Sequence, residues 1–402
     1  MHLKKLSFEE MHNSARSNDA FKKMKKNQVL YNERFSKWYK EMFDETNLKR
    51  YKSKGERLIE CYRFQTWDGY FENKILDNTS HFRCRNRFCL NCQILINAYH
   101  AYRLKPILSD FEKEGYIPYM LTLTVPNCNY ADLRKTIKKM NEAFNKLFKK
   151  FNADDRRGFG PRFIKIHGSI KVLEVTVNKD EKTFHPHFHV LVLLMPDKDD
   201  MKYLRNNIHG RYSHNKGKDN MMSLFSIQIM KMWSMIWYGE TIRKKDFNSW
   251  PDDPNYSVYD DEGNFIKGNL NVNLQPFVSK VESNGVMLDN NTAFAELLKY
   301  CIEFSLIYNI EIFKYLETQL TGVRRIQGSG ILSGILKDIN EDEHDTEGVV
   351  EELILEKKED PQRVITKDLH ELYTTYHDFV KLYRKNTSYD KGVYDVQVSN
   401  QS

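Results

Sequence analysis

Three histidines alternate along one short segment, which reads His185-Pro186-His187-Phe188-His189. The apolar and β-branched run that follows them predicts a strand over residues 185–194. Because side chains along a strand alternate between its two faces, all three imidazoles should project from the same face. Imidazoles two residues apart can bind one divalent ion. A solvated face or satisfied core histidines are the ordinary alternative, but three histidines within five residues favour a metal site.

A carboxylate is expected to lie opposite these histidines. Residues 168–178 predict a second strand, joined to the first by a polar turn, and Glu174 and Thr176 interrupt its apolar row. If Thr176 pairs with His185, Glu174 lies across from His187, with Cβ atoms about 5 Å apart. Histidine with carboxylate suits Mg²⁺ or Mn²⁺ acting as a Lewis acid on a phosphate. His185 competes with Glu174 for the place of third ligand.

Four of the six cysteines are clustered, which indicates a second kind of metal site. Cys84, Cys89 and Cys92 are separated by four and by two residues, and Cys61 precedes them. Four thiolates can bind a structural Zn²⁺ tetrahedrally. The alternatives are a three-cysteine site completed by His81 and a set of buried, apolar cysteines.

A tyrosine and a glutamate share one face of a predicted helix. In the segment 293–300, Glu296 and Tyr300 are four residues apart, and the apolar residues of the segment lie on the other side. A tyrosine hydroxyl can attack a phosphodiester in line, and a glutamate can serve as general base. Tyrosine is common in this chain, at 23 residues, so the pair has meaning only together with the histidine strand.

The elements that must position these residues predict an α+β protein. Residues 119–125 indicate a buried strand, and 133–151 indicate a basic amphipathic helix. Helices are expected over 222–238 and 293–320, and a strand over 269–281. The predicted segments are a basic helical region (1–58), a four-cysteine zinc-binding segment with a helix (59–115), a catalytic domain (116–335), and an acidic linker and tail (336–402).

Charge and composition favour a globular protein that is moderately basic. The chain has 402 residues, and its 62 Lys and Arg against 55 Asp and Glu give a net charge of +7. Because acidic residues gather after Lys337, the rest of the chain is more basic than this total. Basic residues of the N-terminal region and of the helix 133–151, with Arg83, Arg85 and Arg87 beside the cysteines, are candidates for phosphate contacts; solubilising faces are the ordinary alternative.

Membrane insertion is not expected from the sequence. No segment approaches the roughly 18 consecutive apolar residues of a membrane span. Residues 1–16 lack the apolar core of a signal peptide. The expected compartment is therefore the cytoplasm.

The blocks MLTLTVPN (120–127), HPHFHVLVLL (185–194) and AELLKY (295–300) follow the cysteine segment in this order. The combination resembles the replication initiator (Rep) proteins of small Gram-positive rolling-circle plasmids, within the His-hydrophobic-His (HUH) endonuclease superfamily. The resemblance runs from about residue 50 to 335, and the histidine block is its most specific part.

The resemblance implies an antiparallel HUH sheet with flanking helices and an enzyme that nicks one strand of a plasmid double-strand origin. Tyr300 would remain attached to the 5′ phosphate while the 3′ hydroxyl primes synthesis, and Glu296 would activate water for termination. His187 and His189 match the metal-binding pair, and related proteins use an acidic strand residue like Glu174. A host superfamily 1 helicase is the implied partner, and a homodimer is open.

Two positions depart from the family pattern. Glu303 stands where a lysine often follows the tyrosine, so Lys299 is the candidate substitute for holding the scissile phosphate. Leu90 replaces a proline between the last two cysteines, which leaves zinc binding unaffected. Two other functions are considered: a conjugative relaxase or HUH transposase with the same chemistry, and a non-catalytic zinc-ribbon DNA-binding repressor.

Overall fold

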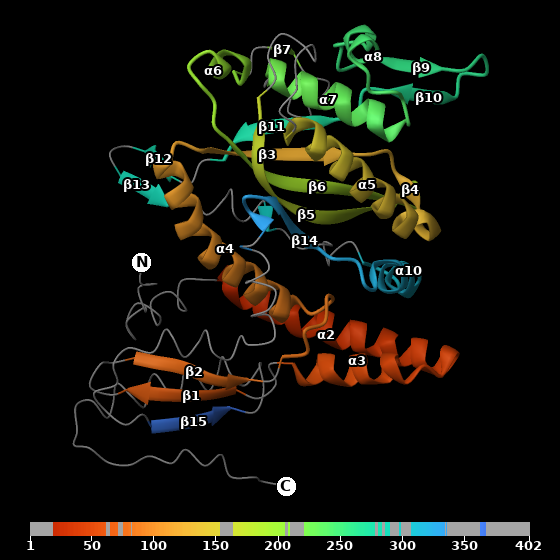
Figure 1. Ribbon diagram of the computed structural model, residues 1–402. Coiled ribbons are helices and arrows are strands. Elements are labelled where there is room, and N and C mark those ends of the chain that lie inside the picture. The colour runs from red at the N-terminus through yellow and green to blue at the C-terminus, as the bar shows by residue number, and fades with distance from the viewer. Residues whose placement is uncertain are drawn as a thin grey trace. The chain divides into compact units, whose positions relative to one another are not determined.

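The computed structural model describes residues 19–61, 65–70, 75–81, 83–152, 164–205, 208–209, 221–277, 280–283, 286–289, 297–298, 307–333, 335 and 362–366. The chain divides into two compact units, one of residues 1–98 and 342–402 and the other of residues 99–341. Helix α4 (Leu90–Lys113) begins in the first unit and continues into the second. The elements are labelled in Figure 1.

The first unit contains a helical hairpin of α2 (Asp19–Thr46) and α3 (Lys49–Glu60). Asn47 makes the turn with a left-handed φ of 55°, a conformation that asparagine tolerates. Gly55 lets the helices approach closely, because a Cβ there would lie 3.2 Å from the Tyr39 Cβ and from the Ser36 carbonyl oxygen. Phe35 and Tyr39 are fully buried. Of the N-terminal region predicted over 1–58, residues 1–18 lie outside the described part of the chain, and the rest forms these two helices.

A small antiparallel sheet completes the described part of this unit. Its order is β15 (Gln362–Thr366), β1 (Gln65–Tyr70), β2 (Ile75–His81). Strand β15 lies within the region that the sequence predicts to be linker and tail, so the described piece of that region pairs with an N-terminal strand. Nothing in the acidic composition around residues 337–360 indicates this pairing.

The second unit is built on an antiparallel sheet of six strands. Their order is β11 (Val272–Pro276), β3 (Ile117–Thr124), β6 (Thr183–Leu194), β5 (Ile166–Asn178) and β14 (Ile326–Gly330), with β4 (Cys128–Asn129) pairing with β6. The hairpin β5–β6 is central, as expected from the sequence (Figure 1). Thr176 pairs with His185 and Glu174 with His187, which is the predicted register.

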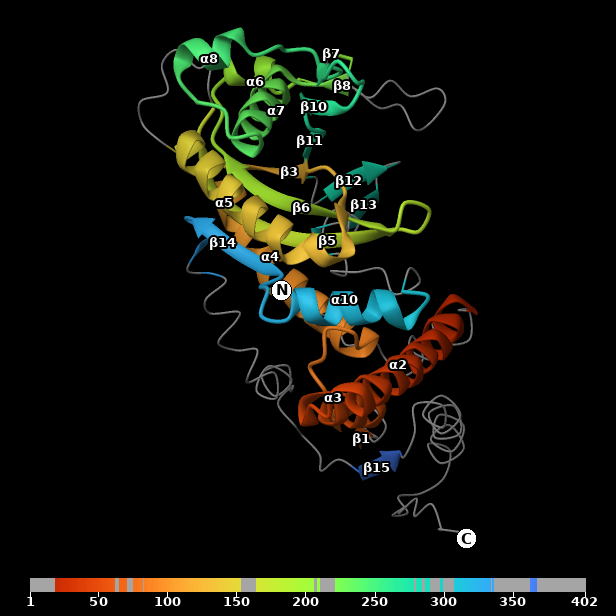
Figure 2. The same cartoon turned by 90° about the vertical axis from the view of Figure 1, so that its right-hand side faces the viewer.

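Helix α5 (Leu133–Asn152) covers one face of this sheet (Figure 2). Its buried residues include Leu133, Ile137, Met140, Phe144, Leu147 and Phe151, the apolar positions that the sequence predicts. The helix is preceded by the short helix η1 (Tyr130–Asp132). Helix α7 (Leu224–Trp237), buried at all but its first position, packs on α5 and β11. The indole of Trp233 donates a hydrogen bond of 2.7 Å to the Thr124 carbonyl at the end of β3.

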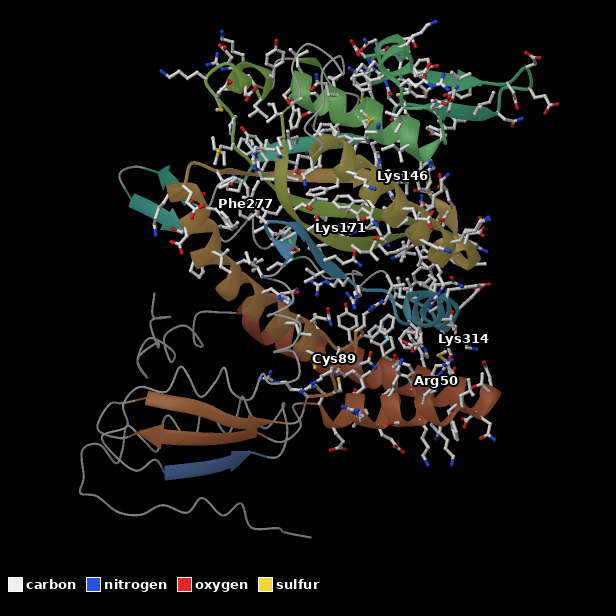
Figure 3. The ribbon with its side chains drawn as sticks, in the orientation of Figure 1. Arg50, Cys89, Lys146, Lys171, Phe277 and Lys314 are labelled. Carbon is white, nitrogen blue, oxygen red and sulfur yellow. The ribbon has the colours of Figure 1, made fainter. Side chains whose placement is uncertain are left out.

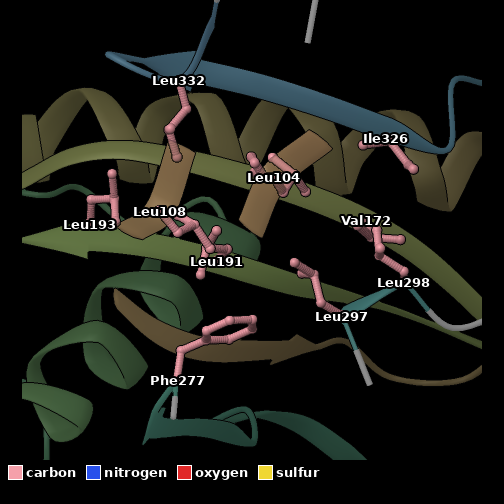
Figure 4. Close-up of a cluster of buried hydrophobic side chains, with 11 residues drawn as sticks. Leu104, Leu108, Val172, Leu191, Leu193, Phe277, Leu297, Leu298, Ile326 and Leu332 are labelled. Carbon is pink, nitrogen blue, oxygen red and sulfur yellow. The ribbon is translucent and has the colours of Figure 1, made fainter. Parts of the chain in front are cut away.

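A hydrophobic cluster covers the opposite face. Leu104 and Leu108 of α4, with Phe277, Leu297 and Leu298, pack against apolar residues of the central strands: Ile170, Val172, Leu191 and Leu193 (Figure 4). Each fully buried side chain of this size contributes roughly 1.5–3 kcal/mol. The cluster therefore attaches the short described piece of the 293–300 segment to the sheet.

The remaining elements are short. They are α6 (Asp200–Tyr203), β7 (Ile208–His209), β8 (Met221–Met222), α8 (Lys244–Ser249), β9 (Ser257–Tyr259), β10 (Phe265–Gly268), β12 (Lys280–Ser283), β13 (Val286–Asp289) and α10 (Ile310–Leu320). The single strand predicted over 269–281 is wrong: β11 ends at Pro276, the Phe277 N–H makes one further hydrogen bond to the Pro118 carbonyl oxygen, and β12 pairs with β13 instead of with β3. Among the described residues, no helix combines the length and the apolarity that spanning a bilayer requires.

Candidate metal sites

One end of the β5–β6 hairpin brings a carboxylate and two imidazoles together. Glu174 Oε2 lies 3.1 Å from His187 Nε2 and 2.7 Å from His189 Nε2. All three side chains point to the face that carries the hydrophobic cluster, because their positions on the strands have the same parity as Val172 and Leu191. Glu174 and His189 are buried and His187 is half-buried, so the group is reached from its His187 side.

The outer nitrogens of both rings face oxygen atoms. His187 Nδ1 lies 3.3 Å from the His185 carbonyl oxygen, and His189 Nδ1 lies 3.5 Å from the Thr122 hydroxyl. A carbonyl only accepts, so Nδ1 of His187 carries the proton and donates it. In the neutral ring Nε2 then presents a lone pair to the Glu174 carboxylate. Two lone pairs at this distance require a cation between them, either a proton or a metal ion.

The charge state of Glu174 suits a cation. Burial alone would raise the pKa of Glu174, but hydrogen bonds from His187 and His189 outweigh it and hold the pKa well below its usual range. The carboxylate is therefore ionised at neutral pH. An ionised carboxylate next to two imidazoles is a ligand set that divalent ions accept.

The spacing of the three atoms also fits a metal. With metal–ligand bonds of about 2.1 Å, neighbouring ligands of an octahedral ion are about 3.0 Å apart, and those of a tetrahedral ion about 3.4 Å. The separations of 2.7 and 3.1 Å lie on the octahedral side. Glu174, His187 and His189 can thus hold an ion such as Mg²⁺ or Mn²⁺ at three positions and leave others for substrate oxygens. Hydrogen bonds from imidazolium rings would have the same lengths.

His185 is placed beside this group but is not one of the three converging ligands. Its ring centroid is 5.4 Å from that of His187. Burial lowers the pKa of His185, which keeps the ring neutral at neutral pH. Its Nε2 is buried and has no hydrogen-bond partner among the described residues. The geometry favours Glu174 over His185 as the third ligand.

The four clustered cysteines converge in the first unit. Sγ–Sγ distances are 3.5 Å for Cys61 and Cys92, 3.7 Å for Cys84 and Cys92, and 3.4 Å for Cys89 and Cys61. A disulfide would need about 2.05 Å. The edge of a zinc tetrahedron with Zn–S bonds of about 2.3 Å is close to 3.8 Å. The cluster therefore has the dimensions of a four-cysteine zinc site; the side chain of His81 lies outside the described part of the chain.

Neighbouring groups already point at the sulfurs. The Cys84 amide lies 3.4 Å from Cys61 Sγ, the Asn86 amide 3.4 Å from Cys84 Sγ, and the Asn32 side-chain amide 3.6 Å from Cys89 Sγ. Hydrogen bonding with the other thiols, with Cys61 first, and burial raise the pKa of Cys84. A buried cluster of this kind holds several thiolates only when a cation compensates them.

The predicted nucleophile, Tyr300, lies outside the described residues. The same holds for the other residues predicted to act with it, which are Glu296, Lys299 and Glu303. Only Leu297 and Leu298 of this segment are described. Arg325, which the sequence analysis did not single out, donates a hydrogen bond of 2.8 Å to the Leu298 carbonyl oxygen. Thr122 was missed as well, although its place in the predicted strand 119–125 could have indicated which face it occupies.

Basic side chains are exposed in both units. Arg85 is exposed, and Arg83 and Arg87 are half-buried beside the cysteines. The lysines of α5 form an exposed set on the helix face away from the sheet: Lys135, Lys138, Lys139, Lys146, Lys149 and Lys150.

Comparisons with known proteins agree with the motifs. A family model described as "Replication protein" matches residues 75–207. A "Protein rep" of Bacillus sp is 32% identical over 161 residues, which are 39% of this chain and 48% of that protein. A "Protein rep" of Bacillus amyloliquefaciens is 25% identical over 303 residues, covering 72% of this chain and 74% of that protein, and one of Staphylococcus aureus is 35% identical over 112 residues, 27% and 44%. The first of these matches spans about half of its relative's length.

No solved structure gives a significant match. The match to the family model nevertheless covers Cys84, Cys89 and Cys92 and the whole β5–β6 hairpin. The sequence matches agree with the resemblance that the motifs indicate: the chain is similar to replication proteins named "Protein rep" from Gram-positive bacteria.

Proposed function

We propose that this protein initiates rolling-circle replication of a plasmid by nicking one strand of the double-strand origin. The observation that carries the proposal is the group of Glu174, His187 and His189 on the central hairpin, in a chain related to Rep proteins. The fold that goes with this function is the HUH type, in which an antiparallel sheet carries the metal and flanking helices complete the domain, here assigned to residues 116–335.

The reaction is a transesterification. The Tyr300 hydroxyl oxygen attacks the scissile phosphorus in line, the bond from phosphorus to the 3′ oxygen breaks, and the 5′ phosphate becomes a phosphotyrosine. The hydroxyl proton leaves with solvent or a base, and the freed 3′ hydroxyl can prime synthesis. Mg²⁺ or Mn²⁺ held by Glu174, His187 and His189 would polarise the phosphate oxygens. Termination follows by strand transfer, or by hydrolysis with Glu296 as general base on water.

The packing of the tyrosine segment supports this assignment. Leu297 and Leu298, which precede Tyr300, are 0% and 2% exposed and belong to the cluster on the sheet face of Glu174 and His189. Leu297 and Leu298 therefore lie on the sheet face of the proposed metal ligands, which supports a nucleophile close to them in sequence.

The DNA-binding surface is assigned by charge. The exposed α5 lysines, Arg83, Arg85, Arg87 and Lys299 are proposed as contacts to the phosphate backbone. Zn²⁺ bound by Cys61, Cys84, Cys89 and Cys92 would make the loop that carries Arg83, Arg85 and Arg87 rigid. The protein would act in the bacterial cytoplasm with origin DNA and a host superfamily 1 helicase, as a monomer or a homodimer.

The proposal is tested by trapping the covalent intermediate. Wild-type protein is incubated with Mn²⁺ or Mg²⁺ and a single-stranded oligonucleotide that carries the nick site, and the adduct is resolved on a denaturing gel. We expect an adduct with wild type, none with Tyr300→Phe, and a wild-type amount with the control Tyr308→Phe, which changes an exposed tyrosine.

Absence of an adduct with wild type, or an undiminished adduct with Tyr300→Phe, would refute the tyrosine mechanism. A non-catalytic zinc-ribbon repressor would bind DNA but form no adduct. A relaxase or transposase would also form the adduct but would transfer the strand to a second DNA end instead of leaving a primer for synthesis.

A further inference from the structure

One residue contacts both the strand that carries Glu174 and the segment that carries Tyr300. Arg325 stands immediately before β14, whose Ile326 pairs with Val172 of β5. The Leu173 amide donates a hydrogen bond of 2.9 Å to the Arg325 carbonyl oxygen, which extends the ladder by one residue. The main chain of Arg325 is therefore fixed beside Leu173, the residue that precedes Glu174.

The side chain of Arg325 reaches the other element. Its Nη2 donates the hydrogen bond of 2.8 Å to the Leu298 carbonyl oxygen. Leu298 and Leu297 are buried next to Val172 and Ile326, as Figure 4 shows. The guanidinium holds a main-chain oxygen, so its contact is to the backbone of the segment whatever the side chains are.

We propose that Arg325 is a positioning residue, which holds the backbone at Leu298, two residues before the proposed nucleophile, beside the metal-binding strand. This inference rests on the proposed function of Tyr300. Tyr300 follows Leu298 by two residues, so a bond that fixes the Leu298 carbonyl also fixes the chain next to the nucleophile. The hydrophobic cluster holds the two leucines against the sheet, but apolar contacts do not fix an orientation. The charged hydrogen bond from Arg325 is directional and fixes the orientation of the Leu298 carbonyl.

Arginine suits this role better than lysine. The guanidinium is planar and always charged, and its rigid fork loses little freedom when it makes a hydrogen bond. Its partner is the main-chain carbonyl group of Leu298, a buried residue. Lysine could reach the same oxygen with one rotatable ammonium but would hold it less firmly.

The expected effect is on the rate of the chemical step. A nucleophile misplaced by about 1 Å can lose about 100-fold in rate. Arg325→Ala should therefore slow adduct formation about 100-fold in a single turnover, with Mn²⁺ affinity and oligonucleotide affinity unchanged. Arg325→Lys should recover part of this loss. The control is Arg324→Ala, which removes the same charge from the exposed neighbouring position.

A second measurement does not depend on catalysis. Amide hydrogen exchange of a peptide covering 296–301 should be faster in Arg325→Ala than in wild type and in Arg324→Ala. Equal exchange in the three proteins, or a wild-type rate of adduct formation in Arg325→Ala, would overturn the inference. A parallel loss of oligonucleotide affinity would also overturn it, because the guanidinium would then hold a phosphate. If wild type forms no adduct, the proposed function fails, and the exchange comparison alone decides the role of Arg325.

Discussion

One carboxylate oxygen of Glu174 lies close to Nε2 of both His187 and His189. A proton or a metal ion must therefore lie between this oxygen and the rings. The Nδ1 atoms of both rings are occupied by the His185 carbonyl and the Thr122 hydroxyl. These contacts fix the ring orientations and leave both Nε2 atoms for a shared cation, as outer partners do in many metal sites. The residue-scale question is which third side chain a metal ion requires, Glu174 or His185.

Two substitutions distinguish these ligands. Glu174→Gln should weaken Mn²⁺ binding by at least the roughly 100-fold that loss of an outer partner can cost. His185→Ala should leave the Mn²⁺ affinity unchanged, because the His185 imidazole is not among the converging ligands. The main-chain carbonyl of residue 185 remains and still accepts the hydrogen bond from His187 Nδ1. Calorimetry or electron paramagnetic resonance of Mn²⁺ measures both. A large loss with His185→Ala and none with Glu174→Gln would exchange the two roles.

The site was predictable where its residues lie on one hairpin. The strand period of two and a polar turn were sufficient to place Glu174 opposite His187. Thr122 and Arg325 come from segments far away in sequence, and no local pattern specifies which remote donor reaches His189 or Leu298. Contacts of this kind depend on strand order, which the sequence left undefined.

At the scale of elements, the sheet and α5 bury a lysine between them. Lys171 of β5 is 4% exposed, donates a hydrogen bond of 2.5 Å to Asn141, and lies 4.6 and 4.7 Å from the ring centroids of Phe144 and Phe188 (Figure 3). No carboxylate among the described residues pairs with Lys171. Its amide partner and the two aromatic faces replace water only in part, so burial lowers the pKa of Lys171 to about 7.

This lysine should make stability depend on pH. In the unfolded chain lysine titrates near pH 10.4, so between about pH 7 and pH 10 the unfolded state binds more protons than the folded state. The free energy of unfolding should therefore rise with pH in this range, by up to about 1.4 kcal/mol per unit from Lys171. Below about pH 7 Lys171 is charged in the folded state as well, and the whole free-energy cost of burying that charge then lowers the stability of the fold.

Urea unfolding at several pH values tests this sign. The stability of wild type relative to Lys171→Met should increase from pH 7 to pH 9, whereas relative to Lys146→Met, a change at an exposed position on α5, it should stay constant. Parallel curves for wild type and Lys171→Met would show that Lys171 is not neutralised by burial.

Elements with strong periodicity were the predictable ones. In α5, each predicted apolar position is buried and each named lysine is exposed. The segment 269–281 misled because its alternation continues to Val281, whereas its pairing with β3 ends near Pro276 and Lys280–Ser283 pairs with β13. Pairing of β15 with β1 joins residues almost 300 positions apart and has no local signal.

At the scale of the whole molecule, the two units have different sources of stability. The unit of residues 99–341 has a sheet with a hydrophobic cluster on one face and buried helices on the other. The described part of the other unit consists of a helical hairpin, a three-stranded sheet and the cysteine cluster. Phe35 packs edge-on against Phe88 beside Cys89, and Asn32 of α2 reaches both Cys89 Sγ and the Leu58 carbonyl, so α2, α3 and the knuckle meet at the sulfurs.

Removal of zinc should therefore unfold the first unit selectively. Structural Zn²⁺ contributes roughly 10–16 kcal/mol of binding free energy in small domains, and this energy becomes folding energy when the ligands meet only in the folded state. A chelator, or Cys61→Ser, should reduce the helical circular dichroism and open residues 30–98 to protease, while a fragment near 99–341 persists and still binds Mn²⁺. The matched control is Cys128→Ser in β4, a half-buried thiol outside the cluster. Protease resistance of 30–98 after chelation, with zinc loss verified by metal analysis, would mean that helix packing alone stabilises the unit and that the cysteines are ordinary buried residues.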